Sequence, residues 1–270
     1  MKYETREEVE AIGRAGQRIT IDDGVIYGRQ LSSFWLALDP EDKGYTPHAM
    51  HDGYWESWIT SWMSRQVMPG NRAIDVGANH GYYSFMMQQA GVQTMAVEPQ
   101  SYLCELLGLS KDKNTHQKNH VEIVHAAVSN YPGEIVQMNV PDGHGMNASI
   151  SKTYIPNAPY GRHMEEVATA TLDSLVSSFT KIDFIKIDVE GAEQAVWEGM
   201  KGLWTRHHPT TVLEFRWDRY ETPEEFARML FADAEVTYVD IDAQEKPIDS
   251  LEHLATKQNE DWMLVLRKKA

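Results

Sequence analysis

The chain has 270 residues, enough for one large domain or two small ones with a packed core. It carries 25 Lys and Arg residues against 40 Asp and Glu residues, and the formal net charge of -15 disfavours an extended nucleic-acid-binding surface. The single cysteine, Cys104, excludes an intrachain disulfide and a zinc site built from several thiolates. The first ten residues have no apolar signal-peptide core, and no apolar run reaches the ~20 residues of a membrane span. We therefore expect a cytoplasmic protein without a transmembrane segment.

Residues 1–70 are predicted to form an extension that packs on the rest of the chain. The segment Arg6–Arg18 is polar and predicted to be helical, and Asp23-Gly24 lies between two β-prone runs, which indicates a hairpin. Gly44–Pro47 is predicted to be a loop.

A helix is expected from Trp55 onward, because apolar residues recur there at helical spacing. This spacing favours packing of the aromatic face in the core. Alternatively, Tyr54 and Trp55 form a wall of a ligand pocket, since aromatic rings stack well on sugar and adenine faces.

Residues 71–270 alternate short apolar strands with helices. The alternation indicates an α/β domain with a doubly wound, mostly parallel, seven-stranded sheet whose ligand lies beyond the carboxyl ends of the strands. The expected strands are Arg72–Val76, Thr94–Glu98, Glu122–Ser129, Asp183–Asp188, Thr210–Phe215, Val236–Ile241 and Trp262–Arg267. The expected helices are Gly81–Ala90, Ser101–Lys113, Ala192–Met200 and Pro223–Phe231. Residues 131–171 interrupt the alternation and are predicted to form an inserted hairpin followed by a long loop, a kind of loop that is often functional.

The turn that follows the first of these strands indicates a nucleotide-like ligand. A buried strand ends at Asp75-Val76, and Gly77 and Gly81 lie in the turn before a helix. Glycine lets the backbone approach a ligand closely. Asn79 stands where a dinucleotide-binding turn has its middle glycine, which counts against NAD.

Glu98 ends the next strand, 98 − 75 = 23 residues after Asp75. An acidic residue about 20 residues beyond the turn is suited to accept hydrogen bonds from both ribose hydroxyls. The turn and Glu98 together predict a site for a nucleoside cofactor.

A third element, Lys186 to Glu193, places Asp188 and Glu190 at the end of a later strand, on the same side. Alternatively, Asp188 caps the following helix, while Glu190 and Glu193 favour its positive N-terminus.

These segments resemble the FkbM-type family of S-adenosylmethionine-dependent methyltransferases over about residues 73–215. The motifs that carry the resemblance are Asp75–Ser84, Glu98-Pro99, Ala126–Ser129, Thr171–Asp173 and Lys186–Glu193. The resemblance implies a Rossmann-like class I methyltransferase fold and O-methylation of a sugar, glycan, glycolipid or natural-product hydroxyl. It implies that the methionine end of the cofactor contacts Asp75, Gly77, Asn79 and Gly81, with Tyr82, Ser84 and Asp188 also in the cofactor site. It further implies that Glu98 holds the ribose and that His125, Ala126 and Ala127 lie near the adenine.

Three residues are candidates for the base or orienting group that an attacking hydroxyl needs. Asp188 is the first choice because it ends a strand at the expected crevice. Glu214 ends the following strand, although an ion pair with Arg216 would explain it equally well. His144, in a Gly-His-Gly loop, is the third.

Other readings remain open at this point. Asp188, Glu190 and Glu214 could together bind Mg²⁺ through oxygen ligands, as the lesser hypothesis. The acceptor could be a protein or a nucleic acid, although the acidic balance counts against nucleic acid. A non-catalytic binding module with the same fold is a further alternative.

Overall fold

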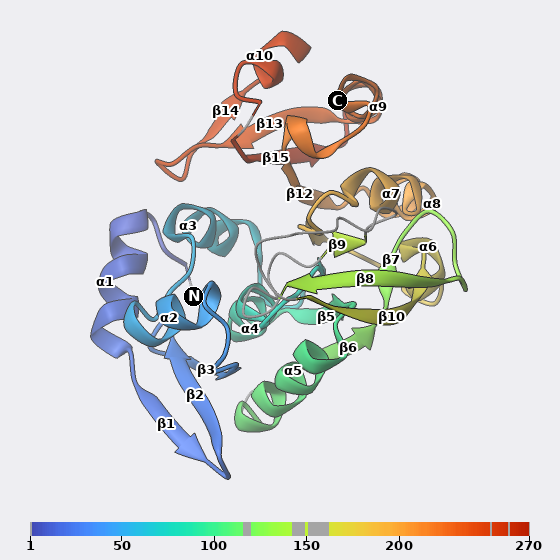
Figure 1. Ribbon diagram of the computed structural model, residues 1–270. Coiled ribbons are helices and arrows are strands. Elements are labelled where there is room, and N and C mark those ends of the chain that lie inside the picture. Colours follow the sequence, from blue (N-terminus) through green and yellow to red (C-terminus); the bar gives the residue numbers. More distant parts are fainter. Residues whose placement is uncertain are drawn as a thin grey trace.

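Figure 1 shows the computed structural model of the chain, in which helices flank a central sheet. The structure describes residues 2–115, 120–141, 149–150, 162–248, 250–258 and 260–269. Within these residues, every helix is too short or too polar to cross a bilayer.

The N-terminal segment contains three helices and a small antiparallel sheet with the order β1-β2-β3. The first helix begins where the Thr5 hydroxyl accepts a hydrogen bond from the Glu8 amide, an N-cap that satisfies one free amide of the first turn. The predicted hairpin is present: Asp23 and Gly24 both have positive φ, as a two-residue type I′ turn requires. The elements are α1 (Arg6–Gly16), β1 (Ile19–Asp22), β2 (Val25–Gln30), β3 (Phe34–Leu38), α2 (Tyr45–His51) and α3 (Ser57–Gln66).

Two predictions for this segment are wrong in detail. A helix begins at Tyr45 where a loop was expected, because Pro47 lies in the first turn of α2, where its missing N–H is not needed. The aromatic helix begins at Ser57, so that Trp55 lies before it. Strand β3 was not predicted from the sequence.

The central sheet has the strand order β14-β13-β15-β12-β11-β4-β5-β6. Strands β6, β5, β4, β11 and β12 are parallel, and β15 is antiparallel to both β12 and β13. Because the chain runs from β4 outward to β6 and then returns to β11, the strand order reverses between β4 and β11, which is where ligands bind in such sheets. The first half consists of β4 (Arg72–Val76), α4 (Tyr82–Gln89), β5 (Gln93–Glu98), α5 (Ser101–Lys113) and β6 (Val121–His125).

The second half follows the insertion and completes the sheet. Pro223 occupies the first turn of α9 with Glu224 and Glu225 beside it, an arrangement that favours a helix start. The elements are α6 (Leu172–Leu175), β11 (Phe184–Ile187), α7 (Glu193–Glu198), α8 (Lys201–His207), β12 (Thr210–Phe215), η2 (Trp217–Arg219), α9 (Pro223–Asp233), β13 (Glu235–Val239), β14 (Glu245–Pro247), α10 (Leu251–Ala255) and β15 (Trp262–Arg267).

The α/β class and the doubly wound, mostly parallel sheet are confirmed, with three differences in the elements. The described part of the sheet has eight strands instead of seven, because the three-residue β14 adds to β13. The expected strand Glu122–Ser129 divides at Ala126, where the chain leaves β5 and pairs with β10 of the insertion instead. The expected helix Ala192–Met200 ends at Glu198, and α8 follows it.

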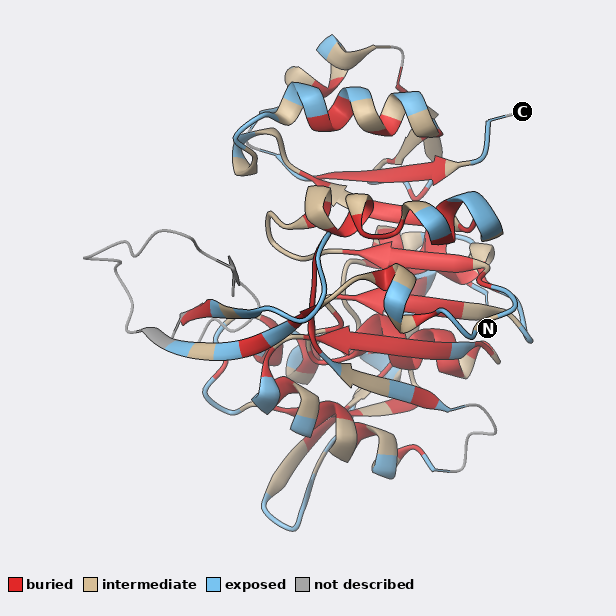
Figure 2. Ribbon diagram, turned by 90° about the vertical axis from the view of Figure 1, so that its right-hand side faces the viewer, coloured by how far each residue is buried: buried red, intermediate tan, exposed pale blue. Residues whose placement is uncertain are grey.

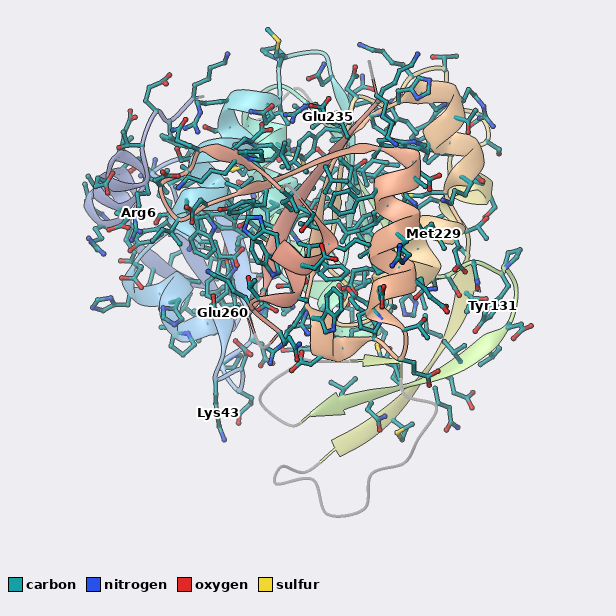
Figure 3. All side chains as sticks on the ribbon, turned by 90° about the horizontal axis from the view of Figure 1, so that it is seen from above. Arg6, Lys43, Tyr131, Met229, Glu235 and Glu260 are labelled. Carbon is teal, nitrogen blue, oxygen red and sulfur yellow. The ribbon has the colours of Figure 1, made fainter. Side chains whose placement is uncertain are left out.

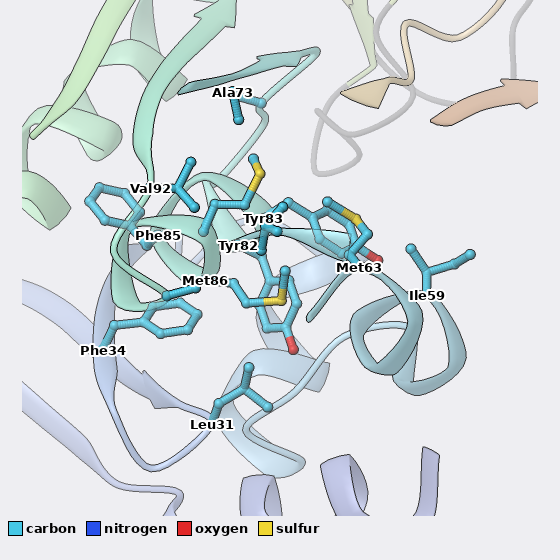
Figure 4. Close-up of a cluster of buried hydrophobic side chains, with 14 of the residues drawn as sticks. Leu31, Phe34, Ile59, Met63, Ala73, Tyr82, Tyr83, Phe85, Met86 and Val92 are labelled. Carbon is cyan, nitrogen blue, oxygen red and sulfur yellow. The ribbon is translucent and has the colours of Figure 1, made fainter. Parts of the chain in front are cut away.

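Alternate residues of each central strand enter two different cores. Ala73 of β4 faces a cluster that includes the N-terminal segment, whereas Ile74 and Val76 face the cluster beneath α7, α8 and α9. Figure 4 shows part of the first cluster, in which Leu31 and Phe34 lie beside α4, and the ring centroids of Phe34 and Tyr82 are 5.8 Å apart. The N-terminal segment therefore covers one face of the sheet, and Figure 2 shows the buried strands between the layers.

The insertion and the preceding strand β7 form a second sheet with the order β7-β10-β8-β9. Its strands are β7 (Ala127–Val128), β8 (Ile135–Pro141), β9 (Ser149–Ile150) and β10 (Arg162–Ala170), with β8 and β10 antiparallel as expected for a hairpin. The hairpin extends on the side to which the parallel strands point (Figure 2). Figure 3, where Tyr131 marks the start of the insertion, shows it reaching beyond the side chains of the core.

Candidate cofactor and active site

A cavity lies at the carboxyl ends of β4, β5 and β11, at the point where the strand order reverses. Met138 of β8 reaches it from the insertion, and Tyr45 and Trp55 reach it from the N-terminal segment. The remaining lining comes from the turns after the three strands and from the start of the insertion: Val76–His80, Tyr82, Tyr83, Val97–Gln100, Ala126–Val128, Lys186, Asp188–Glu190 and Ala192. Segments far apart in the sequence thus form one site.

The turn after β4 packs directly against the end of β11. Gly77 has a φ of 77°, and a Cβ atom added there would lie 1.8 Å from the Asp188 carbonyl oxygen. Only glycine therefore fits at this position. Asn79 also has a positive φ, of 52°, a conformation that asparagine adopts more readily than most residues.

Glu98 is buried at the end of β5 with its carboxylate held by the neighbouring turns. The Asn79 amide donates to Oε2 at 2.8 Å, and the Gln100 amide donates to Oε1 at 3.0 Å. Burial raises the pKa of Glu98 to about 7, although these hydrogen bonds act in the opposite direction. A carboxylate oxygen can accept a further hydrogen bond, so that Glu98 is positioned to receive donors from a ligand.

Three charged side chains lie side by side on β4 and at the end of β11. Lys186 pairs with Asp75 in the sheet register, and its Nζ lies 4.0 Å from Asp75 Oδ1 and 3.0 Å from Asp188 Oδ2. Asp75 is fully buried and accepts a 2.6 Å hydrogen bond from the Ser84 hydroxyl. Burial raises the pKa of Asp75, while the adjacent Lys186 charge lowers it. Asp75 and Ser84 thus lie beneath the cavity, whereas Asp188 lines it.

Tyr83, which lines the cavity, forms a further polar contact with Glu56, which follows the lining residue Trp55 but is not itself part of the lining. The Tyr83 hydroxyl donates to Glu56 Oε2 at 2.6 Å, and the Lys186 ammonium lies 5.1 Å from the centre of the Tyr83 ring. Burial raises the pKa of Glu56 to about 6, and the negative charge of Asp188 acts in the same direction. Glu56 has φ 35° and ψ 70°, a left-handed conformation that costs energy in a residue other than glycine.

Arg219 neutralises the carboxylates on the far side of Asp188. Its guanidinium forms ion pairs with Glu214, with Glu190 at 3.0 Å and with Asp261 at 3.4 Å. Carboxylate oxygens of Asp188, Glu190 and Glu214 lie within 4.8 Å of one another, the set proposed above as magnesium ligands. Burial raises the pKa values of Glu190 and Glu214, and Arg219 lowers them. Since Arg219 contacts two of the three, a protein cation is already present among these oxygens.

An aromatic wall covers the cavity from the N-terminal side. The ring of Tyr45 stacks on His80 at a centroid distance of 4.8 Å, and Trp55 meets Tyr45 edge-on at 5.2 Å. Burial lowers the pKa of His80 to about 4, so that its ring is neutral near pH 7. The alternative given above was that Tyr54 and Trp55 form a wall of a ligand pocket. Trp55 does line the cavity, whereas the Tyr54 hydroxyl contacts Arg14.

The structure brings together most of the predicted cofactor residues but not all of them. Gly77, Asn79, Tyr82, Glu98, Ala126, Ala127 and Asp188 line the cavity. Gly81 lies outside the lining and begins α4 with a φ of 87°. His125 is exposed, and its Nε2 lies 2.8 Å from the Pro99 carbonyl oxygen, so the structure places it outside the cavity.

The predicted acidic and basic groups have different outcomes. Glu214 does not line the cavity and pairs with Arg219, not with the predicted Arg216, which contacts Asp218. Glu193 accepts hydrogen bonds from the Val189 and Gly191 amides, which is the structural role given above as its alternative. Asp188 does not cap α7, whose first residues have no side-chain cap. His144 lies outside the described residues.

Three residues at or beside the cavity, Glu56, Lys186 and Tyr45, were not predicted from the sequence as part of the site. Lys186 had a detectable signal, because it is a lysine in the otherwise apolar strand Phe184–Ile187 and a charge in such a strand needs a partner. Both Glu56 and Tyr45 lie in the N-terminal segment. Tyr45 lines the cavity only through tertiary packing, and Glu56 contacts the lining residue Tyr83 in the same way.

Residues 75–239, more than half of the chain, match the model of the methyltransferase FkbM domain. The chain belongs to the FkbM methyltransferase family. This is the family that the sequence resemblance indicated. No protein of curated function matches it.

Several solved methyltransferase structures are similar to the chain at low identity. The methyltransferase FkbM from Methylobacillus flagellatus KT is 12% identical with a TM-score of 0.46, over 73% of this chain and 43% of that one. A TehB-like SAM-dependent methyltransferase from Corynebacterium glutamicum is 13% identical with a TM-score of 0.46, over 83% and 92%. The 16S rRNA N2 G1207 methyltransferase from T. thermophilus is 10% identical with a TM-score of 0.45, over 94% and 50%. The chain thus spans half or less of two of these three proteins.

The residues that line the cavity fit S-adenosylmethionine. Glu98 presents buried carboxylate oxygens for a pair of hydroxyls, the small side chains of Ala126 and Ala127 leave space for a flat ring, and Gly77 brings the backbone close. Carboxylates outnumber cations at the β11 end, which suits a ligand that carries positive charge.

Proposed function

We propose that this methyltransferase methylates a hydroxyl oxygen of a small molecule, a sugar, a glycan or glycolipid, or a natural product. The observation that carries the proposal is the position of Asp188, a carboxylate that lines the cavity directly beside the glycine turn. A hydroxyl must lose its proton as it attacks, and a carboxylate within hydrogen-bond reach supplies a base or an orienting acceptor for it.

The cofactor would lie across the ends of β5, β4 and β11. Glu98 would accept the ribose hydroxyls, Ala126 and Ala127 would flank the adenine, and the turn from Gly77 to Asn79 would pass beneath the chain to the amino-acid end. When bound, the cofactor supplies an electrophilic methyl group next to a sulfur that leaves as a neutral thioether. The residues of the chain then have to orient an acceptor oxygen opposite that sulfur and exclude water.

Asp188 is a stronger candidate for the base than Glu214. Its carboxylate is 29% exposed and fixed by Lys186, whereas Glu214 is held by Arg219 and does not reach the cavity lining. A positioned base contributes about 10²–10⁴-fold to a rate of this kind. The lysine contact fixes the direction of the carboxylate towards the acceptor.

The charges around Asp188 favour an uncharged acceptor. Carboxylate oxygens of Asp188, Glu190 and Glu214 lie within 4.8 Å of one another, and they repel a phosphate-rich substrate. Trp55 and Tyr45 add aromatic surface to the same cavity, and such surface stacks on the apolar face of a sugar or on a planar ring.

The test is a methyl-transfer assay with isotopically labelled S-adenosylmethionine and a panel of methyl glycosides, catechol and serine. We expect label in an O-methyl product, and we expect Asp188→Asn to lower turnover by about 10²-fold or more while the affinity for S-adenosylhomocysteine changes little. Asp218→Asn is the matched control, because Asp218 is an ion-paired surface carboxylate outside the cavity. Label only on nitrogen, or wild-type turnover by Asp188→Asn, would contradict the proposal.

A further inference from the structure

Glu56 differs from Asp188 and Glu190, the carboxylates that line the β11 end of the cavity, because no cation contacts it within 4.0 Å in the described residues. Asp188 pairs with Lys186, and Glu190 pairs with Arg219. Among the described residues no lysine, arginine or histidine nitrogen lies within 4.0 Å of the Glu56 carboxylate. Its one side-chain hydrogen bond comes from the Tyr83 hydroxyl and goes to Oε2, which leaves Oε1 without a donor in the same part of the structure.

A carboxylate withdrawn from water without a counter-ion is costly, and it favours a site where a cation binds. Burial raises the pKa of Glu56 to about 6, which expresses this cost. The backbone adds to it, because Glu56 holds a left-handed conformation immediately after the cavity residue Trp55. Glu56 therefore combines a desolvated carboxylate with a strained backbone beside the cavity. We expect a cationic ligand there, because its charge would offset the cost of desolvation.

The position of Glu56 in the fold selects the part of the ligand that it faces. Glu98 lies at the end of β5, and Glu56 lies beside Tyr83 and the Lys186–Asp188 pair at the end of β11, with β4 between these two strands. A cofactor whose ribose is held by Glu98 and which crosses the β4 turn therefore directs its amino-acid end to the Glu56 side. That end carries an ammonium group, the cation that an unpaired carboxylate attracts.

We propose that Glu56 binds the α-ammonium group of the amino-acid end of the cofactor, through the oxygen that Tyr83 leaves free. The proposal rests on the placement of the ribose at Glu98 given above and is independent of the acceptor. Glu56 precedes the residues 75–239 that match the family model, so the N-terminal segment supplies part of the cofactor site. Tyr83 acts as a positioning residue that orients the carboxylate.

Calorimetric titration with two ligands tests this role without any acceptor. S-Adenosylhomocysteine has the amino-acid end, whereas 5′-methylthioadenosine has the same nucleoside and sulfur but lacks the ammonium group. We expect Glu56→Gln to weaken binding of S-adenosylhomocysteine by about tenfold or more, as for loss of one charge-assisted hydrogen bond, and to leave 5′-methylthioadenosine within twofold. Glu98→Gln should weaken both ligands.

Glu10→Gln is the matched control, because Glu10 is also a carboxylate of the N-terminal segment that accepts a hydroxyl hydrogen bond, at 2.9 Å from Ser57. Unlike Glu56, it is already ion-paired, with Arg6 and Arg14. The Glu10→Gln substitution should change neither affinity. Equal effects of Glu56→Gln on the two ligands would overturn the proposal. Unchanged affinity for both would also overturn it and would assign Glu56 to the acceptor instead.

A second measurement uses the wild-type protein and does not depend on folding of a variant. The ratio of the two affinities should fall as the pH is lowered through about 6, because protonation of Glu56 removes the charge that only S-adenosylhomocysteine contacts. The charged groups facing Glu56 are Asp188 and Lys186 at the end of β11 and Asp261 before β15, and Tyr83 faces it from α4. A ratio that does not change between pH 5 and 8 would contradict the proposal. Failure of the O-methylation assay would leave this result unaffected, because neither titration involves methyl transfer.

Discussion

The two ends of the cavity are built in different ways. At the β5 end, Glu98 is the last residue of its strand and is held by the Asn79 and Gln100 amides, which belong to the turns after β4 and β5. At the β11 end, Glu56 comes from the N-terminal segment and meets Tyr83 of α4 across 27 positions of sequence. The contacts at the β5 end thus come from backbone amides of neighbouring βα turns. The contact at the β11 end comes from two side chains that tertiary packing brings together.

This difference indicates which end of the cavity can change in sequence without a change in the fold. Backbone amides at the β5 end are fixed by the fold itself, and substitutions there act through conformation. The β11 end depends on side chains that a different N-terminal segment would replace, while β4, β5 and β11 stay the same. We therefore expect damage at the first end to affect folding and every ligand, and damage at the second to affect particular ligands.

Gly77→Ala should show the largest effect. The new Cβ would lie 1.8 Å from the Asp188 carbonyl oxygen, and alanine resists the left-handed conformation, so we expect a loss of about 2–5 kcal/mol in the free energy of unfolding. Gly70→Ala is the control, because Gly70 has a similar φ of 86° with nothing within 4 Å. Its cost should be only the backbone term of about 1–2 kcal/mol. Urea denaturation of both variants checks this, and equal losses would show that the contact with Asp188 is relaxed easily.

Glu56→Gln should raise stability at neutral pH, the reverse of its effect on binding. Burial raises the pKa of Glu56 from 4.5 to about 6, so the ionised form destabilises the folded state. The cost is absent below pH 4.5, grows as the pH rises, and is complete above about 6, where it reaches about 2 kcal/mol at most. Glutamine keeps an acceptor for Tyr83, so thermal unfolding should show a higher Tm than wild type at pH 8 and no difference at pH 4. A lower Tm at pH 8 would mean that the charge stabilises the fold.

The pH dependence of nucleoside binding should show the smallest effect and concerns the β5 end. Burial raises the pKa of Glu98 to about 7, and the ionised carboxylate is the better acceptor for ribose hydroxyls. The affinity for 5′-methylthioadenosine should therefore be constant above about pH 8 and fall towards pH 6 by up to about tenfold per unit. Calorimetry at three pH values measures it, and in Glu98→Gln the dependence should disappear. A pH-independent affinity in the wild type would remove Glu98 from the ribose site.

Much of the fold was predictable because its elements carry strong local patterns. The strand Arg72–Val76 and the helix Ser101–Lys113 agree with the structure at both ends, since their apolar spacing and flanking turns are unambiguous. The division of the expected strand at Ala126 was not predictable, because its apolar run is continuous and only the pairing with β10 separates the two parts. The helix at Tyr45 was hidden by Pro47, which usually indicates a loop but is tolerated in a first turn.

The candidate site divides in the same manner. Gly77, Glu98 and Asp188 were predictable, because each lies at the end of a strand whose order in the sheet follows from the alternation of strands and helices. His125 also ends a strand, but β6 is the edge strand of the sheet, and the His125 ring is exposed and contacts the Pro99 carbonyl oxygen. Glu56 has no motif around it, and its position depends on how the N-terminal segment packs on the sheet. That packing depends on the shapes of buried surfaces, and it produces no residue spacing in the sequence from which the position of Glu56 could be predicted.

The contact between Gly77 and Asp188 has a consequence for how such an enzyme can evolve. The turn proposed to hold the methyl donor and the residue proposed to face the acceptor contact each other through backbone atoms, and the Asp188 amide also donates to the Val76 carbonyl oxygen at 3.1 Å. The distance between the methyl donor and the acceptor would therefore be set by the backbone of the sheet. It would not depend on a side chain that a substitution can replace. Selection can remodel the insertion and the N-terminal segment for a new acceptor without disturbing the alignment that the transfer requires.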